Sequence, residues 1–233
     1  MKREAEPELM ISREQVIAYA NADFSQGEKD FIEFIKNYLK VNKIKLSDND
    51  LIIDLGCGPG NISERLSNEW PDVNVIGIDG SREMIKEAES RRNLKRKLNS
   101  KKFIKLNYIC DDIKNLKLDQ FGSKQKISLI VSNSFIHHLT CIDQFFKCIL
   151  DLSSNETLNF HKDLKRPLNH QEAFALKFKS SQKYNDVLTN DYYASLLASY
   201  TAIEIEKQIL QNSITSMDVI EDGEQYLIVY GKV

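Results

Sequence analysis

The fold is decided by residues 51–61, which read Leu51-Ile52-Ile53-Asp54-Leu55-Gly56-Cys57-Gly58-Pro59-Gly60-Asn61. An apolar run suited to a buried strand leads into a turn with three glycines, and a helical pattern follows. Glycine has no Cβ atom, so a ligand can approach such a turn closely, and the start of the next helix offers free N–H groups to a carboxylate or phosphate. The stretch therefore predicts a strand–turn–helix unit whose turn faces a ligand.

Short apolar runs and helical stretches alternate beyond this turn, which is typical of βαβ units and a parallel sheet. We expect strands at 51–55, 73–78, 103–109, 127–131 and 157–160, and helices at 61–69, 82–98 and 142–152. Because parallel strands are joined by right-handed crossovers, these units must wind into one open sheet with helices on both faces. Ligands bind such a sheet at the carboxyl ends of its strands.

The two ends of the chain carry different patterns. The first forty residues predict two helices, with Ser12 as the candidate N-cap of the first. After Pro167, residues 172–181 and 191–209 have apolar residues at helical spacing and predict an insert or lid. Two strand-like runs, 216–220 and 226–233, flank a turn-rich segment and predict a terminal β-hairpin.

Composition and charge exclude several classes of protein. Apolar residues at 42% and charged residues at 28% are ordinary for a globular chain, and 233 residues suffice for one substantial core. The formal net charge of −2 gives no general attraction for nucleic acid or an anionic membrane. The basic stretch 91–102 is expected to be a solvated helix end, with a contact to RNA or phosphate as the alternative.

The cysteines and the N-terminus indicate the compartment. The four cysteines form no Cys-x-x-Cys pair, and the chain opens with charged residues instead of a signal peptide. No apolar run approaches the roughly 20 residues needed to cross a bilayer. We therefore expect a cytoplasmic protein with no membrane partner.

Carboxylates follow two further strands. Asp79 ends the second strand and reaches the glycine turn if the strands are adjacent; the two adjacent hydroxyls of a ribose can donate to one such carboxylate. The alternative is that Asp79, with Gly80 and Ser81, caps the next helix. After the third strand, Asp111 or Asp112 could accept a hydrogen bond from an adenine amino group, and a helix cap is the equal alternative.

Glycine spacing separates two classes of nucleotide site. Dinucleotide enzymes favour Gly-x-Gly-x-x-Gly, whose third glycine would fall at position 61, where this chain has Asn61. A nicotinamide-dependent oxidoreductase is therefore the disfavoured alternative. A scaffold that binds a cofactor without turnover is a third hypothesis, because a fold does not prove catalysis.

Residues 54 to about 139 resemble class I S-adenosylmethionine-dependent methyltransferases. The resemblance implies that Asp54 and the glycine turn hold the methionine part of the cofactor, Asp79 the ribose and Asp112 the adenine, with S-adenosylhomocysteine as product. Met84 matches an apolar residue that packs on the adenine, and a core methionine is the alternative. The cofactor-binding residues expected are Asp54, Gly56, Cys57, Gly58, Gly60, Asp79, Gly80, Met84, Asp111, Asp112, Ile113, Ser132 and Asn133.

The resemblance also implies the fold class, a doubly wound α/β fold. Its mostly parallel seven-stranded sheet ends in an antiparallel hairpin, in agreement with the separate prediction for 216–233. We expect one methyltransferase domain over 1–233, with an N-terminal helical cover (1–46), a cofactor-binding core (47–165), a helical lid or insert (166–212) and the terminal hairpin (213–233).

The loop after the fourth strand holds the candidates for catalysis. An imidazole can accept the proton that a hydroxyl or amine loses, so His137 is the catalytic candidate and His138 a candidate acceptor contact. Neighbouring side chains are expected to point apart, so at most one acts, and a structural role is the alternative. No third ligand stands beside them in the sequence, so no metal site is expected.

Two further segments point to the acceptor. Residues 163–167 resemble an acidic-to-Arg-Pro motif of some small-molecule methyltransferases, which makes Asp163 and Arg166 candidate acceptor contacts; an ion pair closing the turn into the lid is the alternative. Residues 6–10 and 19–24, with Tyr192, Tyr193 and Tyr200, resemble elements of a bacterial group. Tyr19 is a further candidate acceptor contact. The tyrosines of these segments are expected to cover the cofactor, and a place in the core is the equal alternative.

Together these features predict methyl transfer from S-adenosylmethionine to a small-molecule acceptor. Segments 12–24 and 189–201 should close over the bound cofactor, because helices at both ends of the core can cover the site. RNA methylation is the less favoured alternative, and the oligomeric state is left open.

Overall fold

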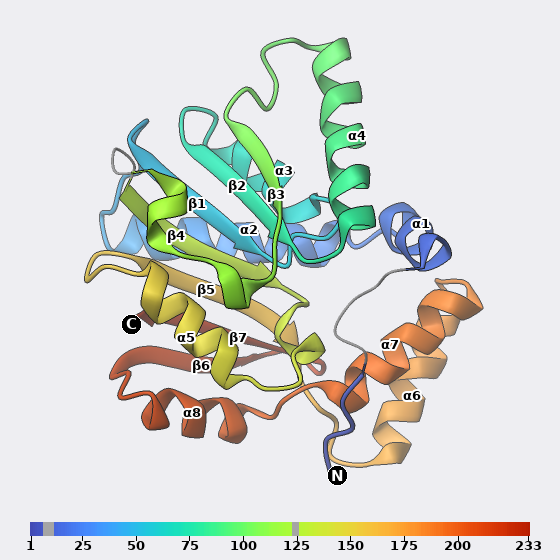
Figure 1. The fold of residues 1–233 in the computed structure, drawn as a ribbon. Coiled ribbons are helices and arrows are strands. Elements are labelled where there is room, and N and C mark those ends of the chain that lie inside the picture. Colours follow the sequence, from blue (N-terminus) through green and yellow to red (C-terminus); the bar gives the residue numbers. More distant parts are fainter. Residues whose placement is uncertain (7–11, 123–125) are drawn as a thin grey trace.

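The computed structural model describes residues 1–6, 12–122 and 126–233, and positions 7–10 of the segment 6–10 lie outside this description. A seven-stranded sheet forms its centre (Figure 1). In spatial order the strands are β3 (Leu106–Cys110), β2 (Asn74–Asp79), β1 (Asp50–Leu55), β4 (Lys126–Asn133), β5 (Leu158–Leu164), β7 (Tyr226–Lys232) and β6 (Ser216–Asp222).

The first five strands run parallel, and β7 lies antiparallel to both β5 and β6. The predicted fold class, with its terminal hairpin, is confirmed. The strand order reverses between β1 and β4, where the chain winds first to one side and then to the other. Crevices at the carboxyl ends of such a switch point are the usual ligand sites of open α/β sheets.

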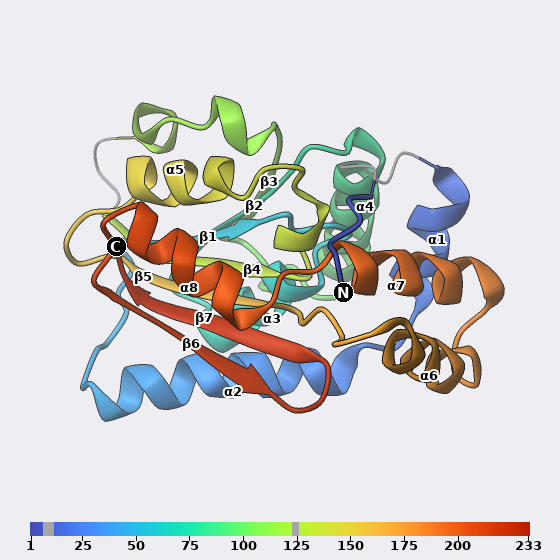
Figure 2. The same cartoon turned by 90° about the horizontal axis from the view of Figure 1, so that it is seen from below.

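Helices cover both faces of the sheet (Figure 2). One face packs against α2 (Ser25–Val41), α3 (Asn61–Glu69) and α4 (Arg82–Leu98), and the other against α5 (Asp143–Leu152) and α8 (Ala202–Gln211). Successive side chains of a strand point to opposite faces. Ile52 therefore packs in the core beneath α2, α3 and α4, whereas Leu51 and Ile53 pack in the core beneath α5 and α8. Residues 1–46 were expected to form a helical cover over the core. Helix α2 within this segment is instead part of the core, because it buries Phe31 and Ile35 against the sheet.

A separate group of helices lies together beyond one end of the sheet in both views (Figures 1 and 2). It consists of α1 (Arg13–Asn21), α6 (His170–Ser181) and α7 (Asp186–Ala198). The side-chain amide of Gln15 in α1 donates to Asp191 in α7 at 3.1 Å and so joins the two ends of the chain. No helix within the described ranges is long and apolar enough to cross a membrane.

Two expected elements differ from the structure. The predicted helix 191–209 is two helices, because α7 ends at Ala198 and a capping box of Thr201 and Glu204 starts α8. Helix α8 packs Ile205 and Ile209 into the sheet core, so it is not part of the lid. The strand expected from 103 begins at Leu106, because Phe103 has a left-handed backbone with φ of 55°.

Short 3₁₀ helices complete the connections: η1 (Ile113–Asn115), η2 (Leu118–Phe121) and η3 (Ile136–His138). The basic residues at the end of α4 are not simply solvated as expected. Arg92 donates to the carbonyl oxygen of Leu106 at 3.0 Å, Arg96 donates to that of Phe103 at 2.6 Å, and Lys95 pairs with Glu64. These cations therefore bind the chain itself.

Candidate functional site

A cavity of about 530 Å³ lies at the carboxyl ends of the parallel strands. Asp54 of β1, Asp79 of β2 and Asn133 of β4 line its floor. Its other walls come from Tyr19 of α1, the first turn of α2, and residues of α6 and α7. The size falls in the usual range of small-molecule and cofactor pockets. The sequence-predicted ligand turn and the predicted lid therefore share one cavity.

The glycines of the turn have different reasons to be glycine. Gly56 has φ of +67°, and a Cβ atom there would lie 2.1 Å from the ring of Phe135. Gly58 also has a left-handed backbone, with φ of +52°, but a Cβ atom there would meet nothing within 4 Å, and the residue lines the cavity. Gly56 thus makes room for a protein side chain, whereas Gly58 leaves open space for a ligand.

The carboxylate of Asp79 holds the glycine turn and also lines the cavity. One oxygen accepts from the backbone N–H of Gly58 at 2.9 Å and the other from that of Ser81 at 2.7 Å. Each carboxylate oxygen has two lone pairs, so both oxygens keep capacity for a donor on a ligand. Burial raises the pKa of Asp79, although these hydrogen bonds oppose the shift.

Asp54 lies beneath the turn and is 1% exposed. It accepts a hydrogen bond from the hydroxyl of Ser63 in α3. Burial raises the pKa of Asp54 to about 7, and the nearby Asp79 adds to the rise. A cationic ligand in the cavity would favour the charged form of Asp54.

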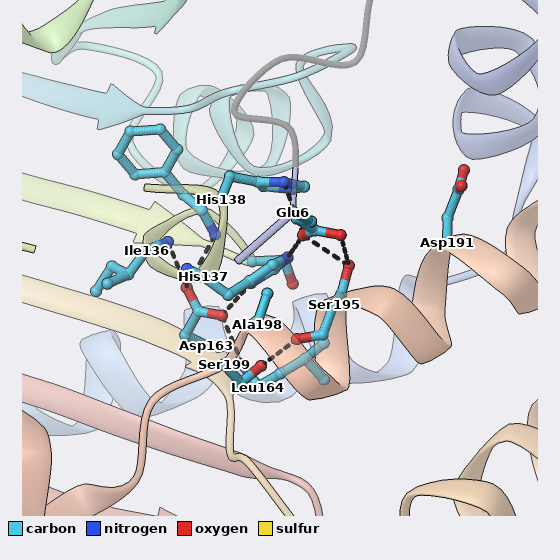
Figure 3. Close-up of polar contacts among 12 residues, drawn as sticks. Glu6, Ile136, His137, His138, Asp163, Leu164, Asp191, Ser195, Ala198 and Ser199 are labelled. Atoms are coloured by element: carbon cyan, nitrogen blue, oxygen red, sulfur yellow. Dashed lines mark hydrogen bonds and ion pairs between the residues drawn. The ribbon is translucent and has the colours of Figure 1, made fainter. Parts of the chain in front are cut away.

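His137 and Asp163 form a buried pair next to the cavity (Figure 3). Nδ1 of His137 contacts one oxygen of Asp163, and the other oxygen accepts from the backbone N–H groups of Phe135 at 3.0 Å and Ile136 at 2.5 Å. Burial opposes charge on His137, but Asp163 and Glu6 raise its pKa overall. Asp163 thus fixes the η3 loop. It binds His137 through Nδ1 only, so the Nε2 atom takes no part in this contact.

Glu6 joins both histidines, and sequence analysis missed it (Figure 3). Its Oε1 lies 3.0 Å from Nδ1 of His138 and 3.6 Å from Nε2 of His137, and Ser195 of α7 donates to it at 3.1 Å. Burial would raise the pKa of Glu6, but the histidines lower it overall. The expectation that the two histidines point apart is wrong: their rings lie 4.2 Å apart at 38°, because η3 turns tightly and both face one carboxylate.

Comparison with known proteins assigns the family. Residues 46–217, most of the chain, match the family described as "Methyltransferase domain". The chain belongs to this family. Its cofactor is therefore S-adenosylmethionine, and the expected class I methyltransferase resemblance is confirmed.

Curated relatives match shorter stretches of this methyltransferase. Trans-aconitate 2-methyltransferase of Rhodopseudomonas palustris (strain HaA2) is 46% identical over 56 residues, which cover 24% of this chain and 20% of the relative. Malonyl-[acyl-carrier protein] O-methyltransferase 2 of Ilyobacter polytropus is 32% identical over 132 residues, which cover 54% of this chain and 44% of the relative. The chain thus matches less than half the length of these two relatives.

Solved structures of methyltransferases share the fold of this chain over nearly its whole length. The plantazolicin methyltransferase BpumL, in complex with a pentazolic desmethylPZN analog and SAH, has a TM-score of 0.68 at 20% identity and covers 95% of this chain and 91% of its own. A SAM dependent methyltransferase from Aquifex aeolicus has a TM-score of 0.64 at 17% identity and covers 93% and 97%. At these identities the likeness supports the fold alone.

The cavity of the methyltransferase contains most of the residues expected to bind the cofactor. These are Asp54, Gly56, Cys57, Gly58, Asp79, Gly80, Met84 and Asn133. Gly60 follows in the same turn, where a Cβ atom would lie 2.2 Å from the hydroxyl of Tyr108. Met84 is 4% exposed and lines the cavity, so its position is compatible with the core alternative, and its contact with an adenine stays a prediction.

Five expected cofactor residues do not line the cavity: Gly60 and the four described next. Asp112 accepts from the backbone N–H of Lys114 at 2.9 Å and caps η1, and Asp111 accepts from the side chain of Asn115, which supports the capping alternative for both. Ile113 packs in the sheet core. The hydroxyl of Ser132 is buried and lies 3.0 Å from Nδ1 of His161.

Asp163 and Arg166, the acceptor contacts expected from residues 163–167, do not line the cavity either. Asp163 is buried and fixes the η3 loop, and it is not among the cavity-lining residues. Arg166 is 7% exposed, pairs with Glu204 of α8 at 2.6 Å and donates to the carbonyl oxygen of Ser199 at 3.2 Å. The alternative, an ion pair that closes the turn into the lid, is the arrangement observed.

The lid side of the cavity contains aromatic residues from distant parts of the chain. Tyr19 and Tyr192, both expected there, line the cavity together with Tyr184. The ring of Tyr19 lies 4.9 Å from that of Phe24, and Phe24 lies 5.5 Å from Tyr184. His138 also lines the cavity, as expected for an acceptor contact.

Sequence reasoning missed further cavity residues. Glu28 of α2 is buried, accepts from Asn61 at 2.7 Å and pairs with Arg65 at 2.8 Å. Lys162 of β5 pairs with Asp222 at 2.6 Å beside the ring of Tyr226. No local motif marks these residues; only the helical phase of α2 and the hairpin register bring them to the cavity.

Proposed function

We propose that this chain transfers the methyl group of S-adenosylmethionine to a small-molecule acceptor inside the cavity. The observation that carries the proposal is the shared cavity, whose lining combines the glycine turn with the tyrosines of α1 and α7. A cofactor on the turn and an acceptor under the lid would then face each other. Alignment of two reactants in this way removes much of the entropic cost of the reaction.

In the proposed reaction the acceptor atom attacks the methyl carbon as the carbon–sulfur bond breaks, and S-adenosylhomocysteine leaves as a neutral thioether. The cofactor is already activated, so the protein mainly positions the reactants and excludes water. Gly58, Asp79 and Asp54 would hold the cofactor. Nε2 of His137, oriented through the pair with Asp163, would act on an acceptor that loses a proton.

A small acceptor is supported by the cavity and by the charge distribution. A cavity of about 530 Å³ under helices suits a metabolite better than a polymer. The basic residues Arg92, Lys95 and Arg96, which sequence analysis weighed as an RNA contact, bind other parts of the chain. The curated relatives are named for methylation of trans-aconitate and malonyl-[acyl-carrier protein].

A metabolite extract supplied with methyl-labelled S-adenosylmethionine tests this proposal. We expect label in a low-mass product, and loss of that label with the Asp79→Ala variant. Label in RNA that disappears when the exposed Lys97, Lys101 and Lys102 are replaced by glutamine would contradict the small-molecule acceptor. These three lysines are chosen for the RNA test because their replacement leaves the internal hydrogen bonds of Arg92 and Arg96 intact.

We also propose that the protein works in a reducing cytoplasm. The four cysteines are free thiols, and Cys57 and Cys148 are buried. Titration of thiols in protein taken directly from cells and denatured should find all four reduced. A disulfide in such protein would contradict this compartment.

A further inference from the structure

Three side chains that bind metals well meet at the edge of the cavity (Figure 3). They are Glu6 from the N-terminal segment and His137 and His138 from η3. One ligand atom from each lies within 4.8 Å of the others. The three are half-buried or buried, so they are not a chance cluster of exposed side chains.

The spacing of these atoms suits a metal ion. Oε1 of Glu6 lies 3.0 Å from Nδ1 of His138 and 3.6 Å from Nε2 of His137. Ligands at about 2.05 Å from a tetrahedral Zn²⁺ ion are separated from each other by roughly 3.3 Å. The two observed distances lie on either side of this value, so small side-chain shifts would suffice for coordination.

The surrounding hydrogen bonds also match those of a metal site. A metal-bound histidine commonly has its other ring nitrogen bound to a carboxylate, which fixes the tautomer and the ring orientation. Here Nδ1 of His137 contacts Asp163, so that Nε2 is directed at Glu6. Glu6 is itself held by the hydroxyl of Ser195 at 3.1 Å. Two of the three ligands are thus positioned by a second layer of residues.

The local charge favours a cation. Glu6 and Asp163 bring two buried negative charges to the histidines. The guanidinium of Arg3 supplies one positive charge, but it is engaged by the carbonyl oxygens of His137 and Leu139 at 3.0 and 2.8 Å. With neutral imidazoles the group therefore keeps an excess negative charge, which a divalent ion would offset.

We propose that Glu6, His137 and His138 bind a divalent transition-metal ion of the Zn²⁺ class. Three protein ligands leave a coordination position open, as in catalytic zinc sites. His137 and His138 line the cavity, so this position would face the acceptor. An acceptor hydroxyl bound there would release its proton to solvent near neutral pH, and its oxygen would keep the electron pair that attacks the methyl carbon. In the metal-bound protein Nε2 of His137 is a ligand and no longer a base, so the ion replaces it as the group that promotes loss of the acceptor's proton.

Zinc binding to the full chain tests this site and needs neither cofactor nor acceptor. Competition with a chromophoric chelator should find one tightly bound Zn²⁺ per chain. Glu6→Gln and His138→Asn should each weaken binding at least tenfold, and Asp163→Asn by roughly 10- to 100-fold through loss of its support for His137. Two matched controls should keep the affinity: Asp191→Asn, a cavity carboxylate outside the cluster, and His170→Asn, an exposed histidine.

Absorption of bound Co²⁺ gives a second readout, because intense visible bands are expected for four-coordinate ligation. The proposal is overturned if the wild-type chain binds no more zinc than Glu6→Gln while both proteins still bind S-adenosylhomocysteine. In that case the cluster is a hydrogen-bonded support for η3. Absence of cofactor binding would instead count against the methyltransferase proposal, so the two failures are distinguishable.

Discussion

Asp54 is the residue whose ionisation should govern cofactor affinity. Burial raises its pKa to about 7, so at lower pH the free protein holds Asp54 in its neutral form. The proposed contact with the protonated amino group of the cofactor's amino-acid part favours the ionised form, so binding must release a proton when the pH is below 7. Affinity should therefore rise with pH, by up to roughly tenfold per unit between pH 5.5 and 7.

Calorimetry with S-adenosylhomocysteine across this window measures the effect, since the ligand's amino group stays protonated below pH 7. In Asp54→Asn the slope should be much smaller, and the remainder should come from Asp79, whose pKa burial also raises. An equal slope in both proteins would show that Asp54 does not face the cofactor.

Gly58 offers a second test at the residue scale. Gly58→Ala places a methyl group in the open space of the cavity, so cofactor binding should weaken by at least tenfold. Gly122→Ala is the matched control, because Gly122 also has a left-handed backbone with no atom within 4 Å of a Cβ but does not line the cavity. Gly58→Ala should cost about 1 kcal/mol of stability through backbone strain, and Gly122→Ala, with φ of 78° and ψ of 144°, should cost at least as much. Equal binding by the two variants would remove Gly58 from the cofactor site.

The sequence could predict which residues line the cavity where their position depends on local order along the chain. Asp54, Gly58 and Asp79 follow strands whose ends must meet at one edge of a parallel sheet, so the cavity floor could be predicted. Glu6 and Glu28 reach the site only through tertiary packing of the N-terminal segment and α2. No spacing in the sequence relates them to the loop at 137–138.

Among the elements, the turn between β5 and the lid depends on Arg166. Because its guanidinium is buried and paired with Glu204, Arg166→Met should destabilise the protein by about 1–3 kcal/mol. Affinity for S-adenosylhomocysteine and the acceptor KM should stay unchanged. Glu204→Gln is the companion variant, and the double variant should lose less than the sum of the two. A raised KM with unchanged stability would restore Arg166 as an acceptor contact.

The lid prediction belongs to α1 and α7. Tyr19 and Tyr192 line the cavity, and Gln15 links the two helices through Asp191, so bound product should slow amide exchange in both helices together. Hydrogen exchange with and without S-adenosylhomocysteine measures this. Helix α8 is the internal control, because it packs on the sheet and should not respond. Protection confined to the glycine turn would mean that α1 and α7 only pack against the core.

Element types could be predicted better than their breaks. The alternation of strands and helices gave the parallel sheet and the hairpin, because burial on two faces imposes a pattern on the sequence. The break between α7 and α8 was missed because the apolar spacing continues across it. Thr201 and Glu204, three residues apart, are a capping signature that marks this break.

On the scale of the whole molecule, the strand order 3-2-1-4-5-7-6 creates one switch point, and the N-terminal helix α1 and the insert helices α6 and α7 cover it. The N-terminal segment and α7 meet at Glu6 and Ser195, beside the loop of β4. The proposed cofactor floor therefore comes from the central sheet, and the proposed acceptor side comes from α1, α6 and α7. This division explains why the sequence resemblance identifies the cofactor and not the acceptor.

The central claim is that this methyltransferase holds S-adenosylmethionine on the glycine turn through Asp79. Calorimetric titration with S-adenosylhomocysteine tests it most directly, with Asp72→Ala as an exposed aspartate control. We predict that Asp79→Ala weakens binding roughly a hundredfold, about 3 kcal/mol, because two charge-assisted hydrogen bonds are lost. Unchanged affinity in a folded Asp79→Ala protein, or tight binding of NADH in place of S-adenosylhomocysteine, would contradict the account.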